Sequence, residues 1–206
     1  MLEVIDASYK DFLIYPHLTF AGGQTTFLMG KSGSGKTTLF KLLNKTAQLE
    51  AGQILYKNQD SASIDPLLLR REVLLVSQSP FLFDDTIKAN FTAFFGFRQL
   101  QPLSDEQIRT YLELVCLDFS LDKQCDELSG GERQRGFIAI HLSLRPMVLL
   151  LDEPTAALDE QTGEKLISNI IAYCQREKIT PIIISHSQLL SSKFADKIID
   201  LDQGDN

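Results

Sequence analysis

A glycine-rich segment near the amino terminus has the residue types and spacing of a phosphate-binding loop. Residues 30–37 read GKSGSGKT, and their glycines let main-chain N–H groups turn toward phosphate oxygens. Lys36 is expected to reach the β- and γ-phosphates of a nucleotide, and the Thr37 hydroxyl to ligate Mg²⁺. A helix beginning near Lys36 would add its positive dipole end. The predicted nucleotide-binding residues of this segment are Gly30, Lys31, Ser32, Gly33, Ser34, Gly35, Lys36, Thr37 and Thr38.

Two adjacent carboxylates follow an apolar run later in the chain. Val148–Leu151 predicts a buried strand, and Asp152 and Glu153 stand at its carboxyl end. An isolated acidic pair is more often a solvated strand end, but the apolar run and the glycine-rich loop favour a catalytic interpretation. Asp152 is therefore expected to hold Mg²⁺, directly or through water. Glu153 is expected to polarise an attacking water as the general base.

Residues 128–135 read LSGGERQR and predict a second anion site. Ser129 and Glu132 form the capping-box pattern of a helix start, which by itself is an ordinary structural feature. Gly130 and Gly131 leave main-chain N–H groups accessible at that helix start, so both interpretations can hold at once. One chain rarely needs two such sites for one γ-phosphate. We therefore expect Ser129, Gly130, Gly131 and Glu132 to serve the nucleotide of a second chain.

The elements around these motifs alternate between strands and helices. A Lys10–Asp11 turn is expected to join the first two strands. From about residue 80 to 145 the pattern is helical, with capping boxes at Ser104 and Ser129. The expected strands cover 2–9, 12–20, 25–29, 52–56, 72–77, 148–151, 181–185 and 197–201. The expected helices include 36–45, 160–177 and a short helix within 61–71 that has Pro66 in its first turn. The prediction is one α/β domain over 1–206, with a core (about 1–79 and 146–206), an N-terminal antiparallel β part and an inserted helical subdomain (about 80–145).

Composition excludes several classes of protein. The chain has 206 residues and a net charge of -7, which argues against a nucleic-acid partner. Its three cysteines form no CxxC pair, which favours free thiols in a reducing compartment. No basic leader opens the sequence, and no apolar stretch reaches the roughly 18 residues of a membrane span. A role at a membrane is therefore expected to depend on another chain.

Taken together, the motifs resemble those of the ATP-binding cassette (ABC) ATPases, and the resemblance covers essentially the whole chain. In that family GKSGSGKT is the Walker A loop of a P-loop NTPase core, VLLLDE the Walker B strand and LSGGERQR the signature. The resemblance implies that Tyr9 stacks on adenine and that Gln78 contacts Mg²⁺ and water. It also implies that Asp159 lies in the D-loop at a dimer interface and that His186 touches the γ-phosphate. With Lys36 and Glu153, Gln78 and His186 complete the catalytic set.

The family further implies ATP and Mg²⁺ as cofactors and two chains closing around two ATP molecules. Such a subunit works as a homodimer or pseudo-dimer on the cytoplasmic face of a membrane, where it powers a separate permease that selects the substrate. Residues 77–91 resemble exporter-type cassettes and putative bacterial iron or metal exporters, although the glycine-rich segment that full exporters carry before LSGG is missing.

Two other functions are weighed against the transporter. A non-transport ABC ATPase would couple hydrolysis to a mechanical or regulatory role at a membrane protein. A simple P-loop kinase would leave LSGGERQR unexplained. The phenylalanines at 91, 94, 95 and 97 are either the core of the helical part or a docking surface for the membrane subunit.

Overall fold

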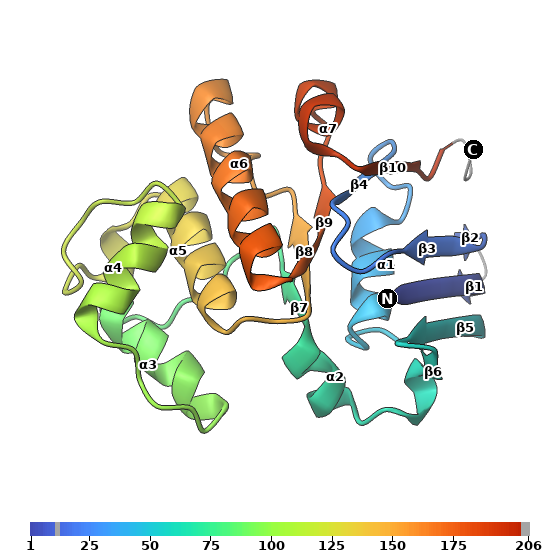
Figure 1. Cartoon of the computed structure of the whole chain (residues 1–206), viewed down its shortest axis with the longest axis horizontal. Helices are drawn as coiled ribbons and strands as arrows, with labels where there is room; N and C mark the ends of the chain where they lie inside the picture. The colour runs from blue at the N-terminus through green and yellow to red at the C-terminus, as the bar shows by residue number, and fades with distance from the viewer. Residues whose placement is uncertain (11–12, 203–206) are drawn as a thin grey trace.

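A parallel sheet forms the centre of the molecule in the computed structural model, which describes residues 1–10 and 13–202 (Figure 1). The strand order is β10-β4-β9-β8-β7, and every neighbouring pair is parallel. The five strands are β4 (Thr26–Met29), β7 (Val73–Val76), β8 (Val148–Asp152), β9 (Thr180–Ile184) and β10 (Lys197–Asp200).

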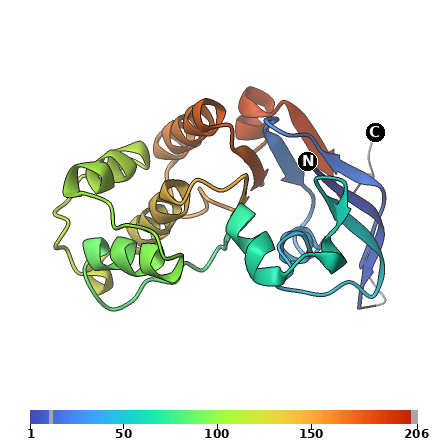
Figure 2. The same cartoon turned by 60° about the horizontal axis from the view of Figure 1, so that its bottom comes forward.

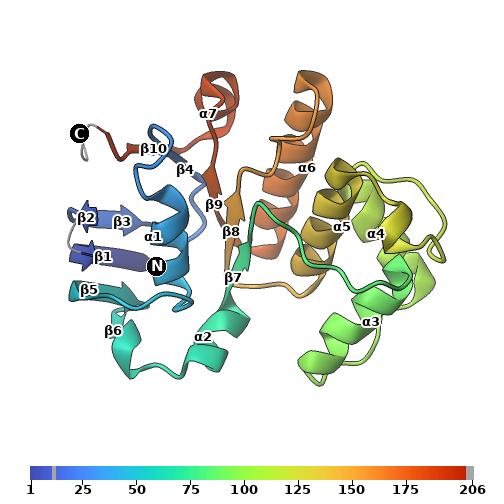
Figure 3. The ribbon, with the colours of Figure 1, turned by 180° about the vertical axis from the view of Figure 1, so that it is seen from behind.

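Both faces of this sheet are buried, as its continuous apolar runs require. Leu149 and Leu151 point into one hydrophobic cluster, and Val148 and Leu150 point into a second cluster on the opposite face. Seen from behind, α1 (Lys36–Leu43) lies between the parallel sheet and the strands β1, β2 and β3, while α5 (Gly130–Ser143) and α6 (Glu160–Glu177) cover the other face (Figure 3). Each fully buried leucine stabilises the fold by about 1.5–3 kcal/mol.

A second, antiparallel sheet is built from the amino-terminal part. β1 (Leu2–Tyr9) pairs with β2 (Leu13–Tyr15), β3 (Leu18–Phe20) and β5 (Ala51–Tyr56), and β6 (Gln59–Asp60) extends the edge. The single strand predicted for 12–20 is wrong: residues 13–20 form two strands, because Pro16 cannot donate a ladder hydrogen bond. Residues 11 and 12, and with them the predicted Lys10–Asp11 turn, lie outside the described residues.

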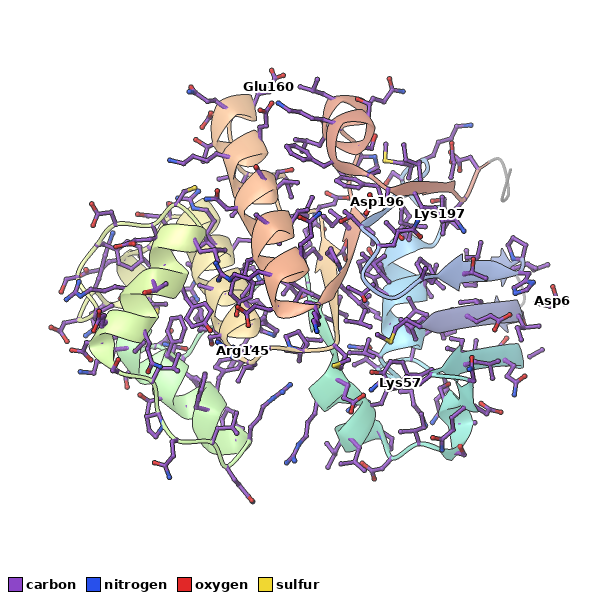
Figure 4. The ribbon with its side chains drawn as sticks, viewed as in Figure 1. Asp6, Lys57, Arg145, Glu160, Asp196 and Lys197 are labelled. Carbon is purple, nitrogen blue, oxygen red and sulfur yellow. The ribbon has the colours of Figure 1, made fainter. Side chains whose placement is uncertain are left out.

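The start of β10 contacts both the strand β4 beside it and the antiparallel sheet. The Thr25 amide donates to the Asp196 carboxylate over 2.8 Å, and the Asp196 and Lys197 amides both donate to the Thr25 carbonyl. The Lys197 ammonium donates to the carbonyl of Thr19, which lies on β3 of the antiparallel sheet. Asp196 and Lys197 are labelled in Figure 4, where β10 and β4 approach the antiparallel sheet. Carboxyl-terminal residues therefore fix the position of the strand that leads into the glycine-rich loop.

The helices largely follow the predicted pattern. The short helix predicted within 61–71, with Pro66 in its first turn, is confirmed as α2 (Pro66–Glu72), which Asp65 caps. A 3₁₀ turn (Ser61–Ser63) precedes it. Sequence reasoning missed α7 (Gln188–Phe194), and α1 ends at Leu43 instead of Lys45. Both predicted capping boxes are present. Within the described residues, no helix is long and apolar enough to cross a membrane.

Three helices form a separate layer between β7 and β8 in the chain. These are α3 (Ile87–Phe97), α4 (Asp105–Leu114) and α5, and Figure 2 shows α3 and α4 on the far side of α5 from the sheets. Phe91 and Phe95 are buried in this layer, whereas Phe97 is 67% exposed. The phenylalanine stretch therefore contributes both to the core and to the surface.

A buried histidine lies inside this helical layer. The His141 ring packs 4.2 Å from the Phe137 ring and 5.9 Å from the Phe94 ring, measured between centroids. Its Nδ1 donates to the Phe137 carbonyl over 2.8 Å. Burial lowers the pKa of His141 to about 4, because an imidazolium ion would lose its hydration there.

This burial predicts a pH dependence of stability. The pKa of His141 in the unfolded chain is close to 6.5, so between pH 6.5 and about 4 the unfolded chain binds a proton that the folded chain does not. The free energy of unfolding should therefore fall as the pH is lowered through this window. His141→Leu should flatten the dependence in urea titrations followed by circular dichroism. Phe94→Leu, which disturbs the same cluster without removing a titratable group, should keep the wild-type slope; equal slopes for His141→Leu and wild type would contradict the assignment.

Candidate nucleotide-binding and catalytic site

The glycine-rich loop connects β4 to α1 and is already curved to receive an anion. Gly30, Gly33 and Gly35 have φ values of 141°, 85° and 93°, which side chains other than glycine rarely adopt. The Lys36 side chain is buried, and its ammonium donates to the carbonyls of Gly30 and Lys31 over 2.7 and 2.8 Å. These two hydrogen bonds hold the loop in a curve around the Lys36 side chain. Main-chain amides at the start of α1 remain available to a phosphate.

A cavity of about 520 Å³ opens beside this loop. Predicted site residues from five separate segments line it together: Tyr9, Ser32, Gly33, Gly35, Lys36, Thr37, Thr38, Gln78, Glu153 and His186. Sequence reasoning missed Lys10, Leu13, Lys41 and Ala47, which also line the cavity. Lys41 could have been found from its place one helical turn after Thr37, whereas Leu13 and Ala47 reach the cavity only through tertiary packing.

A hydroxyl and a carboxylate meet at the inner end of the site. The Thr37 hydroxyl donates to the Asp152 carboxylate over 2.9 Å, which joins the start of α1 to the end of β8. Burial raises the pKa of Asp152, and the hydrogen bond from Thr37 partly offsets that rise. Paired oxygen ligands of this kind suit Mg²⁺, so the two residues fit the ion predicted for them.

The second carboxylate is held between two polar side chains. Glu153 Oε2 accepts from the Gln78 amide and Oε1 from His186 Nε2, each over 3.1 Å. Because a carboxylate only accepts, Nε2 of His186 carries the proton in this arrangement. Glu153 also has a φ of 51°, a backbone conformation that is uncommon for residues other than glycine. Such strain is a frequent feature of residues whose side chains must point in one direction at a functional site.

One buried glutamine outside the predicted set supports this geometry. Gln134, from the second turn of α5, donates from Nε2 to the Glu153 carbonyl over 3.1 Å. The Ala156 amide donates to the same carbonyl over 3.2 Å. The sequence signal was the place of Gln134 within LSGGERQR, but its contact depends on how α5 packs beside β8.

The signature residues lie apart from the glycine-rich loop of their own chain. In the described part of the chain, Ser129, Gly130, Gly131 and Glu132 are not among the residues that line the nucleotide cavity. Gly130 lines a neighbouring cavity of about 420 Å³ together with Gln78 and Gln134. The Ser129 hydroxyl donates to the Glu132 carboxylate over 2.8 Å, which lowers the pKa of Glu132.

In the part of the chain that the structure describes, five further predicted residues are not among those that line the cavity: Gly30, Lys31, Ser34, Asp152 and Asp159. Asp159 begins α6 as its N-cap, accepting from the Thr162 amide. Ser34 is part of the loop, but its buried hydroxyl has no hydrogen-bond partner among the described residues. Asp159 thus has a structural role as a cap, and any role at an interface between chains stays a prediction.

This combination of a phosphate-binding loop, paired carboxylates and a separate signature surface defines a nucleoside triphosphatase of the cassette type. Residues 15–156 match the family of ABC transporters. The chain belongs to the ABC transporter family, which confirms the fold and the family predicted from its motifs.

Curated relatives include both plant and bacterial proteins. The chain is 37% identical to Protein STAR1 of rice (Oryza sativa subsp. japonica), over 85% of this chain and 51% of that protein. It is 37% identical to ABC transporter I family member 17 of Arabidopsis thaliana, over 84% of this chain and 66% of that protein. It is 34% identical to the probable iron export ATP-binding protein FetA of Escherichia coli K12, over 98% of this chain and 91% of that protein. The chain thus spans about half to two thirds of the two plant relatives and most of FetA.

Solved structures share the fold. CbiO1 from Clostridium perfringens, part of the ABC transporter complex cbiONQ, has a TM-score of 0.81 at 28% identity, over 97% of this chain and 83% of that chain. A bacterial Atm1-family ABC exporter with ATP bound has a TM-score of 0.86 at 28% identity, over 98% of this chain and 37% of that chain. The second comparison shows the same fold within a longer chain.

The loop geometry predicts unequal costs for two glycine substitutions. A Cβ at Gly33 would meet no atom within 4 Å, whereas a Cβ at Gly35 would lie 2.7 Å from the Tyr15 hydroxyl. Gly33→Ala should cost about 1 kcal/mol of unfolding free energy from backbone strain alone. Gly35→Ala adds a steric clash and should cost about 2–4 kcal/mol in urea unfolding. Equal losses in the two variants would contradict the close packing at Gly35.

Proposed function

We propose that this chain binds ATP with Mg²⁺, hydrolyses it to ADP and phosphate within a dimer, and thereby drives a separate integral membrane permease. The observation that carries the proposal is the single cavity in which a phosphate-binding loop meets Gln78, Glu153 and His186. ATP-binding proteins of transporters, such as FetA, are among its relatives. The chain would lie on the cytoplasmic face of the membrane.

Each end of the nucleotide has its own set of residues. Main-chain amides at the start of α1 and the Lys36 ammonium bind the phosphates, and Tyr9, which lines the same cavity, stacks on the base. Thr37, Asp152 and Gln78 would hold Mg²⁺ through their side-chain oxygen atoms. When bound, Mg²⁺ neutralises charge on the phosphate oxygens. The buried Asp152 carboxylate favours a cation partner, because burial disfavours its unpaired charged form.

Hydrolysis depends on the orientation of the Glu153 carboxylate. Glu153 accepts a proton from the attacking water, and its two hydrogen bonds to Gln78 and His186 fix the direction in which the carboxylate points. His186 carries a proton on Nε2 in this arrangement and presents a donor at the cavity wall. The chain's own residues thus provide orientation, a base and a hydrogen-bond donor in one place.

The signature residues supply the reason for a dimer. Ser129–Gly131 lie at the N-terminus of α5, outside the cavity of their own chain, and would bind the γ-phosphate held by a second chain. ATP then favours the closed state because it contacts both chains, and loss of the γ-phosphate releases it.

Replacing the proposed base separates binding from hydrolysis. Glu153→Gln keeps the size and hydrogen-bonding shape of the side chain but cannot accept the proton. The variant should bind ATP normally, lose ATPase activity by about 10²–10⁴-fold and accumulate as an ATP-bound dimer. ATPase assays and light scattering with and without ATP measure both effects. Glu106→Gln, at an exposed position of α4 outside the cavity lining, is the control and should keep wild-type ATPase activity without accumulating as an ATP-bound dimer; unchanged activity in Glu153→Gln would overturn the base assignment.

The same variant tests for a membrane partner. Tagged Glu153→Gln protein, incubated with ATP and Mg²⁺, should retain a multi-span membrane protein in stoichiometric amount from detergent-solubilised native membranes. The wild-type protein, which turns ATP over, is the matched comparison and should retain less. Recovery of the ATPase alone, or with soluble proteins only, would favour a role outside transport.

A further inference from the structure

A buried tyrosine connects the base-binding end of the cavity with the phosphate-binding end. Tyr15 lies on β2 and is 1% exposed. Its hydroxyl donates to the Gly35 carbonyl over 2.9 Å and also interacts with the side chain of Thr38. Both partners belong to the glycine-rich loop and the first turn of α1.

The strand that carries Tyr15 also positions the proposed adenine-stacking residue. β1 and β2 are antiparallel, with Tyr9 opposite Leu13 and Ala7 opposite Tyr15. Leu13 and Tyr15 are two residues apart and so share one face of β2, while Ile14 between them is 76% exposed. Tyr9 and Leu13 both line the cavity. One pair of strands therefore presents Tyr9 to the base and Tyr15 to the loop.

The contact with the loop is close. A Cβ placed on Gly35 would lie 2.7 Å from the Tyr15 hydroxyl and 2.9 Å from a methyl carbon of Leu13. Burial raises the pKa of Tyr15 to about 12, so its phenol stays protonated and remains a donor at neutral pH. Because the Gly35 carbonyl also accepts from the Leu39 amide, Tyr15 bonds to the very point where α1 begins.

We infer that Tyr15 is a positioning residue that fixes the distance between the base-binding strands and the phosphate-binding loop. Without its hydroxyl, the loop keeps its own hydrogen bonds, from Lys36 to Gly30 and Lys31 and from the Ser34 amide to Lys31. The strands lose a polar contact that holds Tyr9 at a set distance from the loop. The base site and the phosphate site are then less accurately positioned for one nucleotide, so a nucleotide that occupies both binds more weakly. This inference rests on the proposed ATP-binding function.

The test compares a nucleotide with a ligand that lacks the base. In Tyr15→Phe, the dissociation constant for ADP should rise about three- to tenfold, the effect of one hydrogen bond. The constant for inorganic pyrophosphate should stay within about twofold of wild type, because the loop itself is intact. Both are measured by isothermal titration with Mg²⁺. In ATPase assays the KM for ATP should rise by the same factor, with kcat changing less than about twofold.

Tyr56→Phe is the matched control. Tyr56 lies on β5 of the same sheet, is 4% exposed, and its hydroxyl donates to Glu72 over 2.6 Å, outside the residues that line the cavity. Tyr56→Phe removes a hydrogen bond of a buried phenol, as Tyr15→Phe does, but it should leave the ratio of ADP to pyrophosphate affinity unchanged. Thermal melts of both variants establish that they are folded at the assay temperature.

Three outcomes would count against the inference. An ADP affinity of Tyr15→Phe within twofold of wild type would show that the hydroxyl has no positioning role. An equal loss for ADP and pyrophosphate would show that Tyr15 merely supports the loop. An equal change of the affinity ratio in Tyr56→Phe would assign the effect to general loosening of the sheet. Failure of the wild-type protein to bind ADP would instead overturn the proposed function.

Discussion

The register of the parallel sheet is the constraint on which the site depends. Val76, Leu151 and Ile183 are linked by pairing across β7, β8 and β9, and all three strands end at one edge. Gln78, Glu153 and His186 each stand just beyond a strand end, so their side chains meet although they come from distant parts of the chain. A shift of one residue in β8 would move its leucines from one buried cluster to the other and would take Glu153 out of reach of Gln78 and His186.

Strain at Glu153 is balanced by hydrogen bonds on both sides of the residue. Its amide donates to the Ile184 carbonyl over 3.1 Å, and its carbonyl accepts from Ala156 and Gln134. These contacts hold a φ of 51° that costs about 1–3 kcal/mol in a residue with a side chain. The same strand end therefore aims Asp152 inward at Thr37 and Glu153 outward at the cavity. Two adjacent carboxylates acquire different surroundings through one change of backbone direction.

Motifs and periodic patterns predicted the elements that local sequence controls. The Lys36 helix, the buried β8 and both capping boxes follow from residue order alone, and they place the loop and the carboxylates correctly. Pro16 divides a continuous apolar run in a way that periodicity did not reveal. The positions of Tyr15 and Leu13 depend on packing between elements, so no local pattern marks them. Gln134 stands within LSGGERQR, but its contact with Glu153 also depends on packing. Sequence therefore predicts which residues act more readily than which residues position them.

The place of the helical layer in the chain has a consequence for length variation. The chain leaves the sheet after β7, passes through α3, α4 and α5, and returns at Val148 to form β8, the strand beside β7. The pairing of β7 with β8 is set by their own hydrogen bonds, so residues added or removed in the exposed connection from 99 to 102 need not shift it. An insertion between Val148 and Glu153 would displace the carboxylates directly. We expect homologues to differ in length in the exposed connection after α3 and to keep the length between Val148 and Glu153. A domain inserted into the exposed connection should be tolerated for the same reason.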